Sequence, residues 1–208
     1  MTPTDISVVG PMARRAEDLD LALRALAGPD LLQRTAWQVQ LPPPRRRRLS
    51  EFRVAVWASS PLCRIDTSVS DVFDRAINAV ARAGATVDDA ARPGIADEEH
   101  HRLFMLLLRA ATASRMRDED FTRQQEIAAT LTDDDFSDRA AVARGATLLH
   151  RAWGDANEAR TKLRHTWHEF FERFDVLLTP VAATAAFPHN HNPQRPLAQS
   201  ATISVHAP

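Results

Sequence analysis

The stretch FRVAVW at residues 52–57 determines how the rest of the chain is interpreted. It is short, apolar and rich in β-branched and aromatic residues, which is typical of a buried strand. Apolar residues at helical spacing follow from Val69 to Val80, and Gly84 separates them from a second β-like stretch at 85–87. Strand, helix and strand in this order predict a βαβ unit with a right-handed crossover, and therefore a partly parallel sheet.

Helical patterns lie on both sides of this unit. Residues 13–27 carry apolar residues three and four positions apart, and Gly28 follows as a stop signal. A longer pattern covers residues 138–174, where Gly154 is the expected point of division, and residues 175–180 then indicate a short buried strand. The candidate core positions of the long pattern are Leu148, Leu149, Trp153, Ala156, Leu163, Trp167 and Phe170.

The segment between these patterns is also helix-rich, and residues 103–108 form its most hydrophobic run. We expect this run to be buried. It is far shorter than the roughly 20 apolar residues that a membrane-spanning helix needs. Two parts show no periodicity, namely residues 31–50, which we interpret as a surface connection, and an irregular tail at 181–208. The sequence therefore predicts a helix-rich α/β domain, or a large part of one, in which helices flank the sheet.

Composition excludes several classes of function. With 44% hydrophobic and 25% charged residues, the chain is too apolar for disorder and too charged for a membrane protein. A net charge of -1 argues against a nucleic-acid or membrane partner, so we interpret the four arginines at 45–48 as a solvated loop. Cys63 is the only cysteine, and residues 1–10 lack the pattern of a signal peptide. We therefore expect a cytoplasmic location.

No self-sufficient hydrolytic site is visible in the residues. Serine chemistry needs a serine beside a base, with backbone donors for the oxyanion. The six glycines form neither a Gly-x-Ser-x-Gly nor a Gly-Gly-Ser-Ser stretch. Ser59 and Ser60 follow the predicted strand, and we interpret them as a strand-to-turn connection. Cys63 has no histidine or asparagine near it in sequence and is interpreted as a buried or loop cysteine.

The histidines do not form a metal-binding pattern. His165 and His168 lie three apart on a predicted helix, with Glu169 beside them, but a zinc site needs a third protein ligand. His-Asn-His at 189–191 has the letters of a nuclease motif without its other ligands. No phosphate-binding glycine loop is present either, so we predict no catalytic residue, no metal site and no cofactor. His100 and His101 are adjacent and cannot share a helix face. The adjacent carboxylates at 118–120 and 133–135 are interpreted as helix-cap and turn residues.

Several stretches, taken in order, resemble the amidase signature family. VGPMARRAEDLDLALRALAGPD at 9–30 is similar to the helix that follows the catalytic core of that family. The next βαβ segment of the family resembles residues 52–57, 71–82 and 83–87. Its long helix, following strand and "FPHDH" piece resemble residues 145–153, 157–160, 171–181 and 187–191. The resemblance implies that residues 1–208 form a partial, C-terminal portion of an amidase-signature fold, with a mixed β-sheet.

The family hydrolyses amide C–N bonds with a Ser–cis-Ser–Lys triad. The resemblance implies that the lysine acts through the bridging serine to deprotonate the nucleophile, and that backbone amides of a Gly/Ser-rich loop stabilise the oxyanion. In the family these groups precede the helix that resembles residues 9–30, so none of them maps here. Lys162, the single lysine, lies in the long helical pattern, and we interpret it as solvated. Residues 103–108 and the loop after Pro180 are candidates for one wall of the substrate pocket.

Three hypotheses remain open. The chain is an amidase portion that is inactive alone, while a full-length relative binds a small-molecule amide. Alternatively, it is a non-catalytic interaction module, or half of a split amidase that pairs with a separately encoded catalytic portion through an exposed sheet edge. A helical binding module unrelated to amidases is the third, and the βαβ unit counts against it. Translating the DNA upstream of Met1 distinguishes among them.

Overall fold

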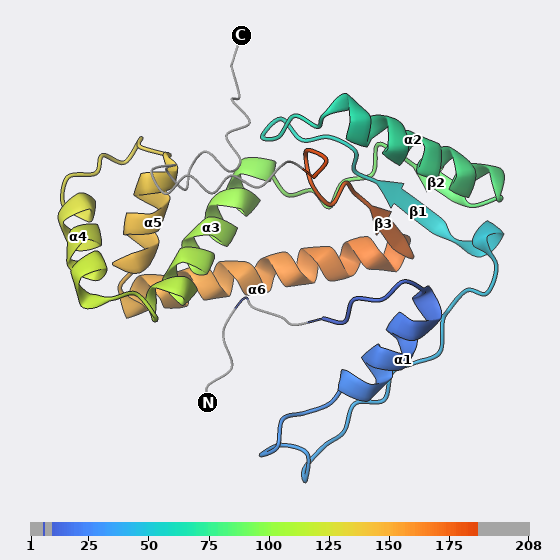
Figure 1. The fold of residues 1–208 in the computed structure, drawn as a ribbon, viewed down its shortest axis with the longest axis horizontal. Coiled ribbons are helices and arrows are strands. Elements are labelled where there is room, and N and C mark those ends of the chain that lie inside the picture. Colours follow the sequence, from blue (N-terminus) through green and yellow to red (C-terminus); the bar gives the residue numbers. More distant parts are fainter. Residues whose placement is uncertain (1–5, 7–9, 187–208) are drawn as a thin grey trace. The chain divides into compact units, whose positions relative to one another are not determined.

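The computed structural model describes residue 6 and residues 10–186, which belong to two compact units, Met1–Arg47 and Arg48–Pro208 (Figure 1). The boundary between the units lies within residues 31–50, the segment that we expected to be a surface connection. The first unit contains helix α1, Ala16–Leu26, which is shorter than the predicted 13–27 because Arg15 and Ala27 at its two ends have extended backbones. After α1, the carboxylate of Asp30 accepts hydrogen bonds from the backbone N–H groups of Leu32 and Gln33 and so forms a turn.

The second unit is built on a parallel sheet of three strands in the order β2–β1–β3. Strand β1, Arg53–Val56, pairs with β2, Thr86–Asp88, and with β3, Val176–Leu178. Helix α2, Thr67–Arg82, connects β1 to β2, so the predicted βαβ unit and the α/β class are confirmed. The resemblance implies a mixed sheet, whereas both strand pairings in the described part of the chain are parallel.

Both faces of the sheet are covered by helices. Side chains alternate along a strand, and Val54 and Val56 of β1 pack against α2 on one face. Ala55 lies on the other face with Phe170 of α6, the helix His150–Arg173. Figure 1 shows α2 and α6 on opposite sides of the strands. The centre of the sheet is therefore the main core of this unit, and it positions the two loops that leave β1 and β3.

The remaining helices form a second cluster. They are α3, Asp97–Ala113, α4, Asp118–Ala128, and α5, Asp138–Ala146, and a short 3-10 turn, Leu49–Glu51, precedes β1. Gly145 of α5 lies against α3, where a Cβ on it would stand 2.3 Å from the Cβ of Arg109. This close approach depends on small residues, and Ala140 and Ala143 of α5 are fully buried. Among the described residues, no helix combines the length and the apolar character needed to cross a membrane.

The long helical pattern at 138–174 divides at a different place from the one predicted. α5 ends at Ala146 and α6 begins at His150, whereas Gly154 lies inside α6 with no atom within 4 Å of a Cβ built on it. Leu149 is extended, with φ -66 and ψ 147, and it acts as the N-cap residue of α6. An isolated glycine costs a helix only about 1 kcal/mol, so Gly154 does not break it.

Burial of the predicted core positions follows the helix faces. Of residues 103–108, Leu107 is buried, with 1% of its surface exposed, whereas Phe104 is 46% exposed, because a continuous apolar run passes around the whole circumference of α3. On α6, Ala156 and Phe170 are buried. Leu149 is 75% exposed, so its placement in the core was wrong; it precedes the helix instead of facing inward from it. The half-buried positions are Leu148, Trp153, Leu163 and Trp167.

Candidate functional site

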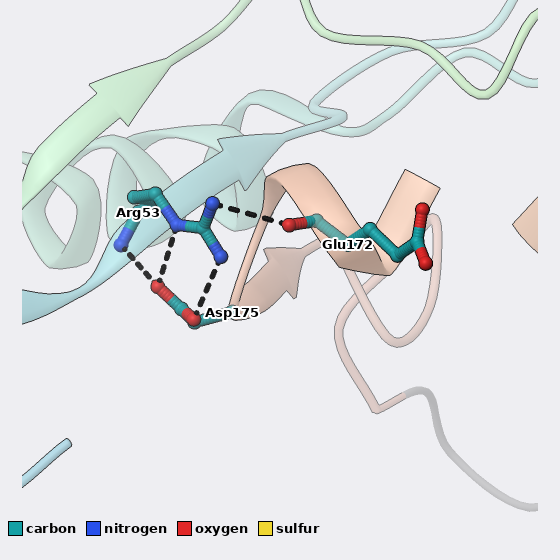
Figure 2. A network of polar contacts seen from close by, with 3 residues as sticks. All are labelled: Arg53, Glu172 and Asp175. Carbon is teal, nitrogen blue, oxygen red and sulfur yellow. Dashed lines mark hydrogen bonds and ion pairs between the residues drawn. The ribbon is translucent and has the colours of Figure 1, made fainter. Parts of the chain in front are cut away.

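An ion pair holds the start of β1 beside the start of β3. The guanidinium of Arg53 donates from Nε to Oδ2 of Asp175 at 3.1 Å and from Nη2 to Oδ1 at 3.0 Å, and its backbone N–H donates to Oδ2 at 2.9 Å (Figure 2). Nη1 donates to the carbonyl of Glu172 at the end of α6. Only 4% of the Asp175 side chain is exposed. Hydrogen bonding to this carboxylate raises the pKa of Arg53. The pair therefore aligns β1 and β3 at their N-terminal ends. The candidate site lies at the C-terminal ends of the same two strands.

A hollow of about 420 Å³, which we call the edge hollow, lies beyond the carboxyl ends of β1 and β3. Parallel sheets commonly bind ligands at this edge. The loop after β1 contributes residues 57–60, and the loop after β3 contributes residues 179–183. Two backbone hydrogen bonds hold these loops, from Trp57 N to Leu178 O at 2.9 Å and from Asp66 N to Ala183 O at 2.8 Å. The hollow therefore depends on the pairing of β1 with β3, because the two loops that line it follow these two strands.

Aromatic rings form much of the lining of the edge hollow. The indoles of Trp57 and Trp167 are stacked, with centroids 6.4 Å apart, and the imidazole of His100 lies 6.2 Å from the Trp167 ring. The guanidinium of Arg92 lies 5.3 Å from the centroid of Trp57. Its Nη1 donates to the carbonyls of Val56, Asp89 and Ala91, which fixes the cation beside the indole. The three rings therefore come from different elements: Trp57 follows β1, His100 lies in α3 and Trp167 lies in α6.

Ser60, a sequence candidate for a nucleophile, forms a turn. Its Oγ donates to Oδ2 of Asp97 at 2.5 Å and accepts from the backbone N–H of Leu62 at 3.2 Å. Its carbonyl accepts from the N–H of Cys63 at 3.1 Å. These bonds link the end of β1 to the first turn of α3. Cys63 is half-buried and lines the edge hollow together with His100. The two residues are far apart in sequence, so the sequence alone did not show that they line the same hollow.

Two other hollows lie close to α3. The first, of about 350 Å³, includes Phe104 and shares Trp57 and His100 with the edge hollow. The second, of about 580 Å³, lies between α3 and the region of α5, and Met105 and Leu106 line it. The residues predicted to form a pocket wall, 103–108 and the loop after Pro180, therefore both contribute to hollows, although not to the same one.

The charged groups of the 580 Å³ hollow bind one another and the backbone. Arg102 lies 4.3 Å from the centroid of the Phe136 ring, and its Nη2 is 3.4 Å from Oε2 of Glu98. Arg144 donates to the carbonyls of Thr132 and Asp135. The hydroxyl and backbone N–H of Ser137 donate to the Asp135 carboxylate and lower its pKa. The contacts of Ser137 are those of the N-cap of α5, and Arg102 makes a surface ion pair and a cation–π contact.

The other sequence candidates lie apart from the edge hollow. Lys162 is exposed on α6 and lines none of the three hollows described above. His165 and His168 are exposed on the same helix, and His168 Nε2 lies 3.8 Å from Glu172 Oε1. Within the described ranges, no three His, Cys, Asp or Glu side chains are grouped in a way that could hold a metal ion. The His-Asn-His stretch at 189–191 lies outside the described residues.

The structure is therefore that of an α/β protein with a hollow at the carboxyl edge of a parallel sheet. The chain belongs to the amidase family, whose model matches residues 2–206. It is 24% identical to the A subunit of the glutamyl-tRNA(Gln) amidotransferase of Gloeobacter violaceus, over 93% of this chain and 43% of the relative. The corresponding protein of Geobacter metallireducens is 25% identical, over 93% of this chain and 44% of the relative. That of Geotalea daltonii is 26% identical, over 88% and 42%. The chain thus spans less than half the length of these relatives.

Proposed function

We propose that this chain forms one wall of the amide-binding site of an amidase-family protein, and that the nucleophile comes from residues other than these. The edge hollow is the observation that carries the proposal, because it has the position and size of a ligand site. The sequence holds no Gly-Gly-Ser-Ser stretch, and its single lysine, Lys162, is exposed on α6. The hollow therefore supports binding and orientation of an amide, and the chemistry needs a second source of residues.

The separation of amide binding from nucleophilic attack follows from the chemistry of amide hydrolysis. An activated serine must attack the carbonyl while backbone donors stabilise the oxyanion, and the amine or ammonia leaves before water completes the reaction. A wall that orients the acyl group beside such a serine converts a bimolecular encounter into a positioned one. In this proposal Trp57, Trp167 and the loop after Pro180 supply that positioning.

A separately encoded catalytic portion is the partner that we propose. The relatives are named as subunits of an amidotransferase, which fits a protein that works in an assembly. Among the described strands, β3 pairs only with β1, and its outer edge is the place where we propose that a strand of the partner pairs. An unpaired strand edge is a ready template for another chain.

The test is ammonia release from simple amides and from glutamine, by the purified chain alone and mixed with the catalytic portion of one of these relatives. We expect no release by the chain alone and release by the mixture above that of the catalytic portion by itself. Activity of the chain alone that survives Lys162→Ala would contradict the proposal. A stable complex without any gain in ammonia release favours the interaction-module alternative instead.

A further inference from the structure

The charges around the edge hollow indicate which amides it accepts. Among the described residues that line it, none is aspartate, glutamate, lysine or arginine. An amino-acid amide such as glutamine carries an ammonium and a carboxylate, and each needs a partner of opposite charge when it leaves water. The lining offers such a ligand no permanently charged side chain.

Two charged side chains that contact lining residues are engaged elsewhere. Asp97 binds the hydroxyl of Ser60 and lines the neighbouring 350 Å³ hollow instead of this one. Arg92 donates to three backbone carbonyls and lies over Trp57. Both charges are therefore already partly compensated by contacts within the chain, and neither side chain lines the edge hollow.

The rest of the lining suits a flat apolar group. Trp57, Trp167 and His100 line it with rings that already contact one another, and a further aromatic ring can join such a cluster in an offset-stacked or edge-to-face arrangement. Ile65, Leu177 and Val181 add aliphatic surface, and Ser59 and Thr179 place hydroxyls at exposed positions, where an amide group can form hydrogen bonds. A volume of about 420 Å³ is sufficient for an aromatic ring with a short substituent.

We propose that the edge hollow binds the aromatic group of an uncharged amide and selects aryl or arylalkyl amides over amino-acid amides. This inference rests on the function proposed above, in which the hollow is the amide-binding site. The occupant is a small molecule whose ring lies among Trp57, Trp167 and His100. Its amide group is directed toward the rim, where the nucleophile of the catalytic portion would approach.

Isothermal titration calorimetry of the full chain with phenylacetamide, acetamide and glutamine tests this proposal. We expect phenylacetamide to bind at least about tenfold more tightly than the other two, because only its ring removes a large apolar area from water. Trp57→Leu should weaken phenylacetamide binding several-fold. Trp153→Leu is the matched control, because Trp153 lies in the same unit, is half-buried like Trp57 and lines none of the three hollows, and it should leave binding unchanged.

A second variant avoids the risk that Trp57→Leu disturbs folding. Val181 lines the edge hollow yet is fully exposed, so Val181→Asp places a carboxylate at the site at little cost in packing. It should weaken phenylacetamide several-fold and favour the cation phenylethylammonium. Leu149→Asp, at a position that is 75% exposed and outside the hollow, should do neither.

Three results would overturn the proposal: glutamine binding as tightly as phenylacetamide, toluene binding as tightly as phenylacetamide, or mutual exclusion of phenylacetamide and the catalytic portion. The last would place the hollow within the interface between the two chains. Binding is measured here without turnover, so its outcome is separable from that of the proposed function. Selective binding of phenylacetamide without ammonia release by the mixture rejects the proposed function and leaves this inference standing.

Discussion

At the scale of single residues, two glycines in helices have opposite surroundings. A Cβ on Gly145 would stand 2.3 Å from the Cβ of Arg109 and 3.0 Å from the backbone of Ala110, whereas Gly154 faces open space. We expect Gly145→Ala to lower the free energy of unfolding by about 1–3 kcal/mol, since overpacking outweighs helix propensity. Gly154→Ala should raise it by up to about 1 kcal/mol. Urea unfolding measures both, and equal effects of the two changes would refute the close packing of α3 on α5.

The carboxylate of Asp175 is the second residue whose role can be tested. It accepts three hydrogen bonds from Arg53 and is nearly buried, so Asp175→Ala leaves a guanidinium and a backbone N–H without their acceptor. We expect a clear fall in Tm, and a smaller one for Asp175→Asn, which keeps one acceptor oxygen. Asp20→Ala is the control, because the Asp20–Arg24 pair is more than half exposed and such pairs contribute little. Equal Tm values for Asp175→Ala and Asp20→Ala would show that the pair does not align β1 and β3.

At the scale of elements, the N-terminus of α2 introduces a dependence on pH. The hydroxyl and backbone N–H of Ser68 donate to the Asp66 carboxylate and lower its pKa from 3.8. The folded pKa is the lower one, so this stabilisation is complete above the ordinary pKa and is lost as pH falls through the folded value. We therefore expect wild-type stability to fall more steeply below about pH 4 than that of Asp66→Asn, which retains the cap without titrating.

Urea unfolding of both proteins across this pH range measures the difference. Asp134 and Asp135 also have lowered pKa values and titrate in both proteins, so their contribution cancels in the comparison. Parallel pH profiles would show that the cap of α2 adds nothing to stability.

Elements with a clear period were predictable from the sequence, whereas of the edge hollow only the loop after Pro180 was predicted. The apolar run at 52–57 and the helical spacing before Gly84 suffice for the βαβ unit, because burial on a sheet and on a helix face imposes different periods. The break between α5 and α6 carries neither glycine nor proline at residues 147–149, so tertiary packing decides it. The stacking of Trp57 on Trp167 joins two segments far apart in sequence, and single-sequence periodicity carries no information on such a pair.

At the scale of the whole molecule, the buried core is small for a chain of this length. Ten hydrophobic residues are buried among those that the structure describes, and six of them are alanines. Only Val54, Val56, Leu107 and Phe170 are large, and full burial of such a side chain contributes about 1.5–3 kcal/mol. Within the second unit Phe136 and Leu149 remain 63% and 75% exposed. The described part of the fold therefore has exposed apolar surface and few large buried side chains.

The small buried core and the exposed apolar residues predict how the isolated chain behaves in solution. Exposed apolar surface and a sheet edge that no described strand covers favour poor solubility and binding of a hydrophobic dye by the folded chain. If a catalytic portion pairs with β3 and covers this surface, its addition should displace the dye. An unrelated protein of similar size is the control, and it should leave the dye bound. A monomer that stays soluble and binds no dye would contradict this prediction, because it would show that the apolar surface is covered without a partner.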